Sequence, residues 1–333
     1  MTENIAEPSV SMITRLSPAK LNLFLHITGK RADGYHNLQT VFRLLDWGDY
    51  LHFSVSDNAV ISTIDSELSA DQFCHQLLIL AGAEAITISI EDNLIFKAAR
   101  ALLASAIQSN TLPEQLAKVH ITLDKHLPMG AGLGGGSSNA ATTMLVLNEI
   151  WQLNFTCDEL IKIGATVGAD VPIFIFGQDA IAMGIGEELT AIDLPGQQYL
   201  VLTPNAHVNT AKLFAHPKLQ RDIAPLSVAT IQNQYADYLQ TLTTPYHNVF
   251  TPVVTSLAPA VADALSYLQG LEAQALSTAR MTGSGSAVFL PLDASVATNK
   301  KLVVKWIADA PCAAYVVGNF KQHIQPLDFL SSK

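Results

Sequence analysis

Pro128-Met-Gly-Ala-Gly-Leu-Gly-Gly-Gly-Ser-Ser-Asn-Ala-Ala141 is the stretch that decides the fold. Glycine and serine fill most positions from 130 to 138, so few side chains cover the backbone N–H groups there. Apolar residues then recur at helical spacing, at Ala140, Met144, Leu147 and Trp151. A bare loop that leads into a helix N-terminus forms an anion cradle suited to phosphate. We therefore predict a phosphate-binding loop rather than a flexible linker, because linkers seldom run directly into an amphipathic helix.

Known kinds of phosphate loop fit this stretch to different degrees. A Walker A loop requires Gly-Lys-Ser/Thr, and no lysine follows these glycines. Gly130, Gly132 and Gly135 satisfy the GxGxxG pattern of dinucleotide sites, but residues 124–128 separate the preceding strand from the glycines, and no acidic residue ends a strand about 20 residues later. The VAIK-type lysine and the HRD segment of protein kinases are missing. A nucleotide loop of another kind remains, with a nicotinamide-dependent oxidoreductase as the alternative.

Length and composition narrow the class of protein. The chain has 333 residues, which predicts two domains, and 49% apolar against 14% charged residues allow a sizeable core. A net charge of −10 argues against sequence-independent binding of nucleic acid or anionic lipid. No apolar run reaches the ~18 residues of a membrane span, and the N-terminus lacks the pattern of a secretory signal. We expect a cytoplasmic protein with a small-molecule substrate and no nucleic-acid or membrane partner, as a monomer or weak homodimer.

The cysteines and histidines do not form a metal-binding pattern. Cys74, Cys157 and Cys312 are far apart in the sequence, which predicts buried thiols in a reducing compartment rather than disulfides or a zinc site. The ten histidines are scattered without HExxH spacing.

Apolar spacing predicts the order of elements in the first half. Alternation over residues 20–27 indicates a strand with Lys20 and Asn22 on one face. Asp33-Gly34 indicates a turn before the next strands. The further expected elements are strands at 38–45 and 50–55, an irregular segment at 57–85, a helix at 93–107 and a strand at 119–123.

A composition change suggests where the domains divide. Thr156 and Glu159 form the capping box of a helix that Gly168 can close. After Leu194-Pro195-Gly196 the sequence changes to loops, a strand at 199–202 and long, weakly charged helical stretches. We therefore expect one domain at 1–195 and a second at 196–333.

Three segments in the expected order resemble motifs of the GHMP kinases, the superfamily of galactokinase and mevalonate kinase. Pro128–Ala141 resembles the phosphate loop, Ser17-Pro-Ala-Lys-Leu-Asn-Leu-Phe-Leu25 the first motif, and Met281-Thr-Gly-Ser-Gly-Ser-Ala-Val-Phe289 the third. Gly29-Lys-Arg-Ala-Asp-Gly-Tyr-His36 and Gly168-Ala-Asp-Val-Pro172 resemble the branch that phosphorylates 4-diphosphocytidyl-2-C-methyl-D-erythritol in the non-mevalonate isoprenoid pathway.

This resemblance implies both a fold and a reaction. The implied fold is α+β, with an N-terminal domain like ribosomal protein S5 domain 2 and a C-terminal ferredoxin-like α/β sandwich meeting at a cleft. The implied reaction is direct transfer of a phosphoryl group from ATP, with Mg²⁺, to the C2 hydroxyl of the cytidylyl methylerythritol substrate. Ala131 stands where the family has glycine, so we expect no positive φ there. A GHMP-like sensor that binds without transfer is a further alternative, and the presence of both Lys20 and Asp170 argues against it.

Lys20 and Asp170 are the expected catalytic residues. From spacing alone, Asp170 is a cap or turn residue, and Lys20 is a strand residue that extends its ammonium group to water. By resemblance, Asp170 accepts the proton of the attacking hydroxyl, while Lys20 orients Asp170 and stabilises charge on that oxygen. Asn22, on the same strand face as Lys20, is expected to hydrogen-bond the substrate.

The resemblance also implies a pocket for the cytidine base. Tyr35 is expected to stack on the base, His36 to read its edge, Phe214 to lie on the other side and Thr210 to contact the same ligand. Without the resemblance, Tyr35 and His36 are ordinary hairpin residues and Phe214 is a core residue.

The expected ATP site completes the set. Asn93 and Lys125 resemble residues near the adenosine, although Lys125 alone reads equally well as a solvated lysine. Ser137 and Ser138 are expected to cap the helix and to reach phosphate or Mg²⁺. The sequence identifies no carboxylate ligand for the metal. Residues 283–285 indicate either a turn before a strand or a backbone segment that closes the cleft. The loop residues expected to hold ATP are Pro128, Met129, Gly130, Ala131, Gly132, Leu133, Gly134, Gly135, Gly136, Ser137 and Ser138.

Overall fold

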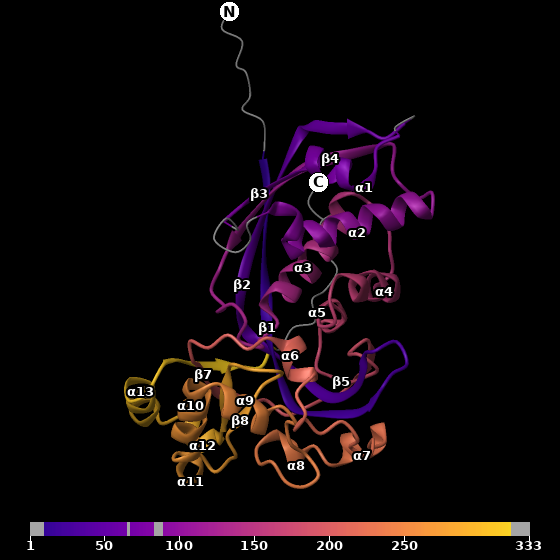
Figure 1. The fold of residues 1–333 in the computed structure, drawn as a ribbon. Helices are drawn as coiled ribbons and strands as arrows, with labels where there is room; N and C mark the ends of the chain where they lie inside the picture. The colour runs from indigo at the N-terminus through magenta and orange to yellow at the C-terminus, as the bar shows by residue number, and fades with distance from the viewer. Residues whose placement is uncertain (1–9, 65–66, 83–88, 321–333) are drawn as a thin grey trace, which may run out of the picture.

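Two β-sheets form the framework of the protein (Figure 1). The computed structural model describes residues 10–64, 67–82 and 89–320. The larger sheet has the strand order β3-β4-β2-β5-β6, with β1 paired to β2, and the smaller has the order β10-β7-β9-β8. The strands are β1 (Val10–Lys30), β2 (His36–Ser62), β3 (Leu78–Ala81), β4 (Gln115–Asp124), β5 (Ala180–Met183), β6 (Glu188–Ala191), β7 (Gln198–Thr203), β8 (Arg280–Met281), β9 (Val288–Leu292) and β10 (Ala313–Gly318).

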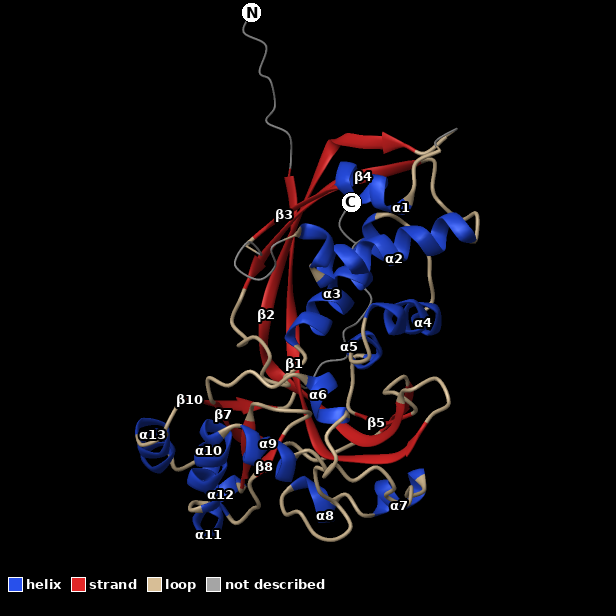
Figure 2. Cartoon of the chain, in the orientation of Figure 1, coloured by secondary structure: helices blue, strands red, loops and turns tan. Residues whose placement is uncertain are grey.

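Helices fall into an N-terminal and a C-terminal set (Figure 2). The first set is α1 (Ala70–Leu77), the 3₁₀ turn η1 (Ile90–Asp92), α2 (Leu94–Gln108), α3 (Gly135–Ile150), α4 (Cys157–Val167) and α5 (Val171–Phe176). The second set is α6 (Thr210–Phe214), α7 (Val228–Asn233), α8 (Ala236–Leu239), α9 (Thr251–Leu257), α10 (Pro259–Gln269), α11 (Glu272–Ala275), α12 (Ala294–Ala297) and α13 (Lys300–Ala308). No helix in the described ranges is long and apolar enough to cross a membrane.

Three apolar clusters hold these layers together. In Figure 1, α1 to α5 lie along one face of the larger sheet, where Phe53 of β2 packs with Phe96 of α2 and Met144 of α3. A second cluster fills the space between the smaller sheet and its helices. The third joins the two sheets, because Leu21 of β1 shares it with Phe289 of β9. Strand β1 is therefore held between the two halves, where a residue on it can face both.

Strand β2 corrects the prediction of separate strands at 38–45 and 50–55. It runs without a break through Gly48, which lies opposite Pro18 at a register shift in the β1–β2 ladder. A Cβ at Gly48 would overlap the carbonyl oxygen of Ser17. Glycine here therefore marks a close approach of two strands rather than a turn.

The expected irregular segment at 57–85 is also partly wrong. Strand β2 continues to Ser62, and α1 and β3 follow. Ser69 and Gln72 form a complete capping box at the start of α1, a local signal that sequence reasoning missed. Residues 65–66 and 83–88 of this segment lie outside the described residues.

Other predicted elements have mixed outcomes. The capping box of Thr156 and Glu159 and the cap at Gly168 are confirmed at the two ends of α4. The long helices expected after residue 196 are wrong, because the longest in the described part of that half, α10, has 11 residues, and β8 and β9 lie between the helices. The thiol prediction holds for Cys74 but is wrong for Cys157, which is exposed at the first turn of α4.

Candidate active site

The three motif segments meet at one place in the structure. The backbone N–H of Lys20 donates to the carbonyl oxygen of Leu133 at 3.0 Å. The N–H of Asn22 donates to the Thr282 hydroxyl at 2.8 Å. The N–H of Ala287 donates to the carbonyl oxygen of Ala131 at 2.9 Å. Strand β1, the glycine loop and the β8–β9 connection are thus fastened to one another through their backbones.

The glycine loop has the conformation that its composition predicts. Gly130, Gly132 and Gly134 have φ values of +68°, +77° and +77°, and Ala131 is not among the residues with positive φ, as expected. A Cβ at Gly134 would lie 2.7 Å from Cζ of Phe174. Glycine at 134 therefore meets both a conformational and a steric requirement.

A cavity of about 360 Å³ lies along this loop, and almost all the residues expected to hold ATP line it. We call it the ATP cavity. Its walls include Asn93, Lys125 and every residue from Pro128 to Ser137. Asn93 is the N-cap of α2 and accepts a hydrogen bond from the N–H of Ile95, so a structural role accounts for its side chain.

Ser138 departs from the prediction. The N-cap of α3 is Gly134, with no side-chain cap, so Ser137 and Ser138 do not cap the helix. Ser138 does not line the ATP cavity, and its hydroxyl is buried without a hydrogen-bond partner among the described residues. The helix begins earlier than expected because the left-handed Gly134 supplies the turn that a capping side chain would otherwise stabilise.

Asp49 is a residue of this site that sequence reasoning missed. Its carboxylate is completely buried and accepts hydrogen bonds from Nζ of Lys125 at 2.7 and 3.0 Å. It also accepts from the N–H groups of His126 and Leu127 and from the side-chain amide of Asn139. Asp49 thus fixes the chain segment that enters the loop and ties it to α3. The available signal was an acidic residue directly after Gly48 within a strand, which is uncommon in a buried position.

Asp49→Asn tests this arrangement. We expect the KM for ATP to rise at least fivefold and the melting temperature to fall, because the neutral amide no longer pairs with the Lys125 ammonium, which is 23% exposed, and it removes the charged acceptor of several hydrogen bonds, at a cost of about 2 kcal/mol. The measurements are steady-state kinetics and thermal unfolding. Asp309→Asn at the exposed end of α13 is the matched control, and an Asp49→Asn enzyme with unchanged KM and melting temperature would contradict the assignment.

Lys20 and Asp170, which are far apart in the sequence, are brought together. Nζ of Lys20 lies 3.4 Å from Oδ2 of Asp170. The lysine side chain is 3% exposed and the aspartate side chain 37% exposed. A ligand therefore reaches the pair from the side of the Asp170 carboxylate. Asp170 precedes the first residue of α5 and makes no side-chain capping bond, which leaves its carboxylate free of that structural role.

Asn22 orients the lysine rather than lining an open pocket. Its Oδ1 accepts a hydrogen bond from Nζ of Lys20 at 2.6 Å, and its Nδ2 donates to the Thr40 hydroxyl at 3.0 Å. The two side chains share a strand face, as the alternation predicts. Asn22 is 3% exposed, so contact with substrate would require it to give up an internal bond.

A second cavity adjoins the first at the glycine loop. It has a volume of about 460 Å³, and its lining includes Asp170 together with Gly130 and Gly132, which also line the ATP cavity. Thr210 lies on its wall, and its hydroxyl is 3.0 Å from that of Ser284. A phosphoryl group held by the loop would therefore lie next to Asp170.

The residues expected to hold the base are only partly assembled. The rings of His36 and Phe214 stack with centroids 5.0 Å apart, and Phe214 also packs edge-on against Phe250. Tyr35 is 62% exposed in the β1–β2 turn. A base that stacks on the Phe214 face now covered by His36 must displace the imidazole.

His36 has a free functional group. Its Nε2 is buried and has no hydrogen-bond partner among the described residues. Desolvation lowers the pKa of His36, with smaller contributions from the positive charges of Arg221 and Lys30. The ring is therefore neutral at pH 7 and can offer one donor and one acceptor to a ligand.

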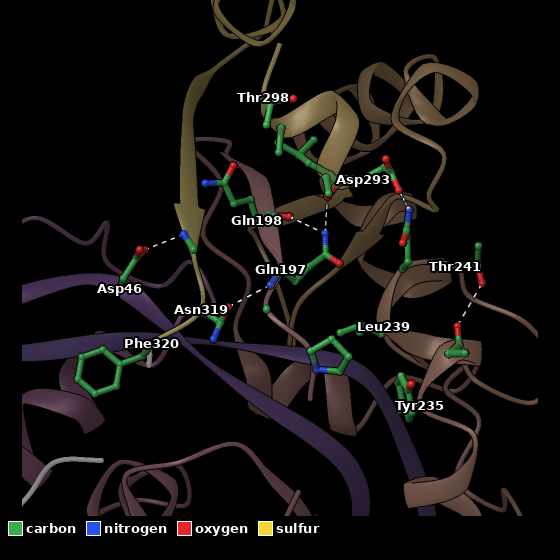
Figure 3. A pocket seen from close by; sticks show the side chains of 18 of the residues that line it. Asp46, Gln197, Gln198, Tyr235, Leu239, Thr241, Asp293, Thr298, Asn319 and Phe320 are labelled. Carbon is green, nitrogen blue, oxygen red and sulfur yellow. Dashed lines mark hydrogen bonds between the residues drawn. The ribbon is translucent and has the colours of Figure 1, made fainter. Parts of the chain in front are cut away.

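A larger hollow of the described chain lies elsewhere (Figure 3). It has a volume of about 1330 Å³, and its walls come from the start of β7, the end of β10 and the segments around Tyr235 and Asp293. The figure shows several of its polar side chains bonded to the protein itself, as Asn319 is to the N–H of Gln197. None of the predicted site residues lines it, so volume alone does not locate the active site here.

Comparisons with known proteins decide the family. Residues 93–178 match the GHMP kinases N terminal domain. A 4-diphosphocytidyl-2-C-methyl-D-erythritol kinase of Psychrobacter arcticus is 76% identical over 322 residues, covering 95% of this chain and 99% of the relative. The chain belongs to the 4-diphosphocytidyl-2-C-methyl-D-erythritol kinase family. It is a small-molecule kinase.

Solved structures agree with this kinase family and its fold. A crystal structure of 4-(cytidine 5'-diphospho)-2C-methyl-D-erythritol kinase has a TM-score of 0.67 and 28% identity, covering 93% of this chain and all of the other. A homoserine kinase from Cytophaga hutchinsonii has a TM-score of 0.58 at 16% identity, covering 96% and 98%, a likeness of fold alone. The expected α+β GHMP kinase fold is confirmed.

Proposed function

We propose that this kinase transfers the γ-phosphoryl group of ATP to the C2 hydroxyl of 4-diphosphocytidyl-2-C-methyl-D-erythritol, giving ADP and the 2-phosphate. The observation that carries the proposal is the 3.4 Å approach of Lys20 to Asp170 beside a glycine loop of the GHMP type. The names of its relatives support this choice of substrate.

The proposed mechanism needs no phosphoenzyme. Asp170 accepts the proton of the C2 hydroxyl while that oxygen bonds to the γ-phosphorus, and the bond from the γ-phosphorus to the bridging oxygen breaks to release ADP. Lys20, oriented by Asn22, stabilises the negative charge on the attacking oxygen. A tertiary hydroxyl is crowded and weakly acidic, so a preorganised pair aimed at it supports the reaction better than a lone base.

Mg²⁺ is proposed as the partner of ATP. It would neutralise phosphate charge, mostly through phosphate oxygens and water. The first turn of α3 offers it the hydroxyl of Ser137, which lines the ATP cavity, whereas the hydroxyl of Ser138 is buried outside that lining. A hydroxyl oxygen fits a hard cation.

Recognition of the base is proposed to depend on Tyr35, His36 and Phe214. An aromatic platform binds any base, so the choice of cytosine requires hydrogen bonds to its edge. The neutral His36, with its unpartnered Nε2, supports that role. Thr210 is proposed to contact the same substrate. It lies on the wall of the cavity of about 460 Å³ beside Asp170, which we call the transfer cavity.

Tyr35→Ala is expected to raise the KM for the cytidylyl substrate about tenfold while kcat and the KM for ATP change little. Loss of one base–aromatic stack removes roughly 1–3 kcal/mol of binding. The exposed Tyr235→Ala is the control. If the KM for the cytidylyl substrate stays unchanged, Tyr35 does not belong to the base site.

A test of substrate class compares acceptor alcohols. ADP release is measured with the cytidylyl alcohol, with mevalonate and with homoserine, each at the same concentration. The proposal expects rapid ADP release with the first alone. Faster release with mevalonate or homoserine would show that the chain is a related kinase for a different alcohol.

We also propose the domain division 1–195 and 196–333. The two sheets support it, since β6 ends at Ala191 and β7 begins at Gln198. The S5 domain 2-like and ferredoxin-like descriptions remain part of this proposal.

A further inference from the structure

His207 lies in the transfer cavity although no motif points to it. It belongs to the segment between β7 and α6 and lines the 460 Å³ cavity together with Asp170. This segment comes from the C-terminal half, whereas the glycine loop comes from the N-terminal half. His207 thus brings a side chain of the C-terminal half to the edge of the loop, where it can contact a ligand that the loop holds.

The imidazole packs directly on the loop. A Cβ at Gly130 would lie 3.0 Å from Nδ1 of His207 and 3.6 Å from its Cε1. Gly130 also has a positive φ of +68°, so glycine both permits the loop conformation and leaves room for the ring. The ring nitrogen closest to the loop is therefore near the phosphate oxygens that the loop would hold.

The charges around the cavity explain what such a ring could do. Among the described residues that line it, His207 is the single side chain able to carry a positive charge, and Asp170 is the single carboxylate. The nearby cations already have partners: Lys20 bonds to Asn22 and approaches Asp170, and Lys125 is paired with Asp49. If the proposed function holds, two polyanions, ATP and the diphosphate-bearing alcohol, must nevertheless bind next to each other here.

We propose that His207 donates a hydrogen bond to an oxygen of the γ-phosphoryl group of bound ATP, beside Gly130 of the glycine loop. The inference rests on the proposed function for the direction of transfer, but contact with the γ-phosphate can be measured without the acceptor. In this role His207 senses the terminal phosphate and holds it toward Asp170. His207 thereby adds a residue of the C-terminal half to a phosphate site that is otherwise built from the glycine loop.

The test is a comparison of two nucleotides by calorimetry. His207→Ala should weaken binding of the non-hydrolysable analogue β,γ-imido-ATP about tenfold, the effect of one charge-assisted hydrogen bond, and binding of ADP less than twofold. His207→Lys should restore most of the analogue's affinity. His120→Ala on the exposed face of β4 is the control, with both affinities unchanged.

Three results would overturn the proposal: equal losses for the two nucleotides, no loss for either, or a loss confined to the KM for the acceptor alcohol. The binding experiment contains no acceptor, so it still decides the role of His207 if the cytidylyl alcohol proves to be the wrong substrate. Phosphorylation of that alcohol at the normal rate by a His207→Ala enzyme with unaltered analogue binding would reject His207 and leave the proposed function intact.

Discussion

Asp170→Asn is expected to lower kcat by about 10²-fold or more while the KM for ATP stays nearly unchanged. The amide keeps the shape of the carboxylate but cannot accept the hydroxyl proton. Asp170 lies on the wall of the transfer cavity and outside the lining of the ATP cavity, so nucleotide binding should not depend on it. Steady-state kinetics with each substrate varied in turn separates the two effects.

The control for this experiment is Asp263→Asn, on the exposed side of α10. Its kinetic constants should match those of the unaltered enzyme. Near-normal kcat in Asp170→Asn would show that positioning alone drives the transfer and that Asp170 is not the base.

Lys20→Met is expected to lower kcat by ~10²-fold without loss of thermal stability. Methionine can occupy much of the buried space beside Phe42, over whose ring the ammonium lies at 5.3 Å. Removing one partner of an ion pair is costly mainly when it leaves a buried charge uncompensated, but the charge left here, on Asp170, is 37% exposed and stays hydrated. A fall in kcat together with an unchanged melting temperature therefore separates a catalytic role from a structural one.

A double-mutant cycle makes this prediction sharper. Because Lys20 and Asp170 lie 3.4 Å apart, we expect them to act as a unit. The enzyme carrying both Lys20→Met and Asp170→Asn should be about as slow as the slower single variant. Multiplication of the two single effects would contradict a shared role, and Lys301→Met on the exposed face of α13 is the control.

Local sequence information was sufficient for the glycine loop. Its glycines at 130, 132 and 134 sit where φ is positive, and α3 begins within it at Gly135. The same information was misleading at Gly48, where a glycine permits two strands to approach instead of ending one. A glycine in isolation does not distinguish conformational freedom from lack of space for a Cβ, and only the paired strand resolves the two.

Long-range proximity was not accessible to spacing arguments. Alternation placed Lys20 beside Asn22 on one face, but the family resemblance was needed to associate Lys20 with Asp170. Asp49 and His207 were missed because their roles arise from contacts with a loop distant in the sequence. No periodicity encodes such contacts. The proposed base site shows the same limit, since His36 covers the face of Phe214.

Phosphorus NMR of a mixture of the enzyme, ATP, Mg²⁺ and 4-diphosphocytidyl-2-C-methyl-D-erythritol tests most directly whether the phosphoryl group passes to the acceptor alcohol. We predict that the γ-phosphate signal of ATP is replaced by ADP signals and by one new phosphomonoester signal, with the diphosphate of the cytidylyl group intact. Formation of ADP with inorganic phosphate alone, or a spectrum that does not change with time, would contradict the account.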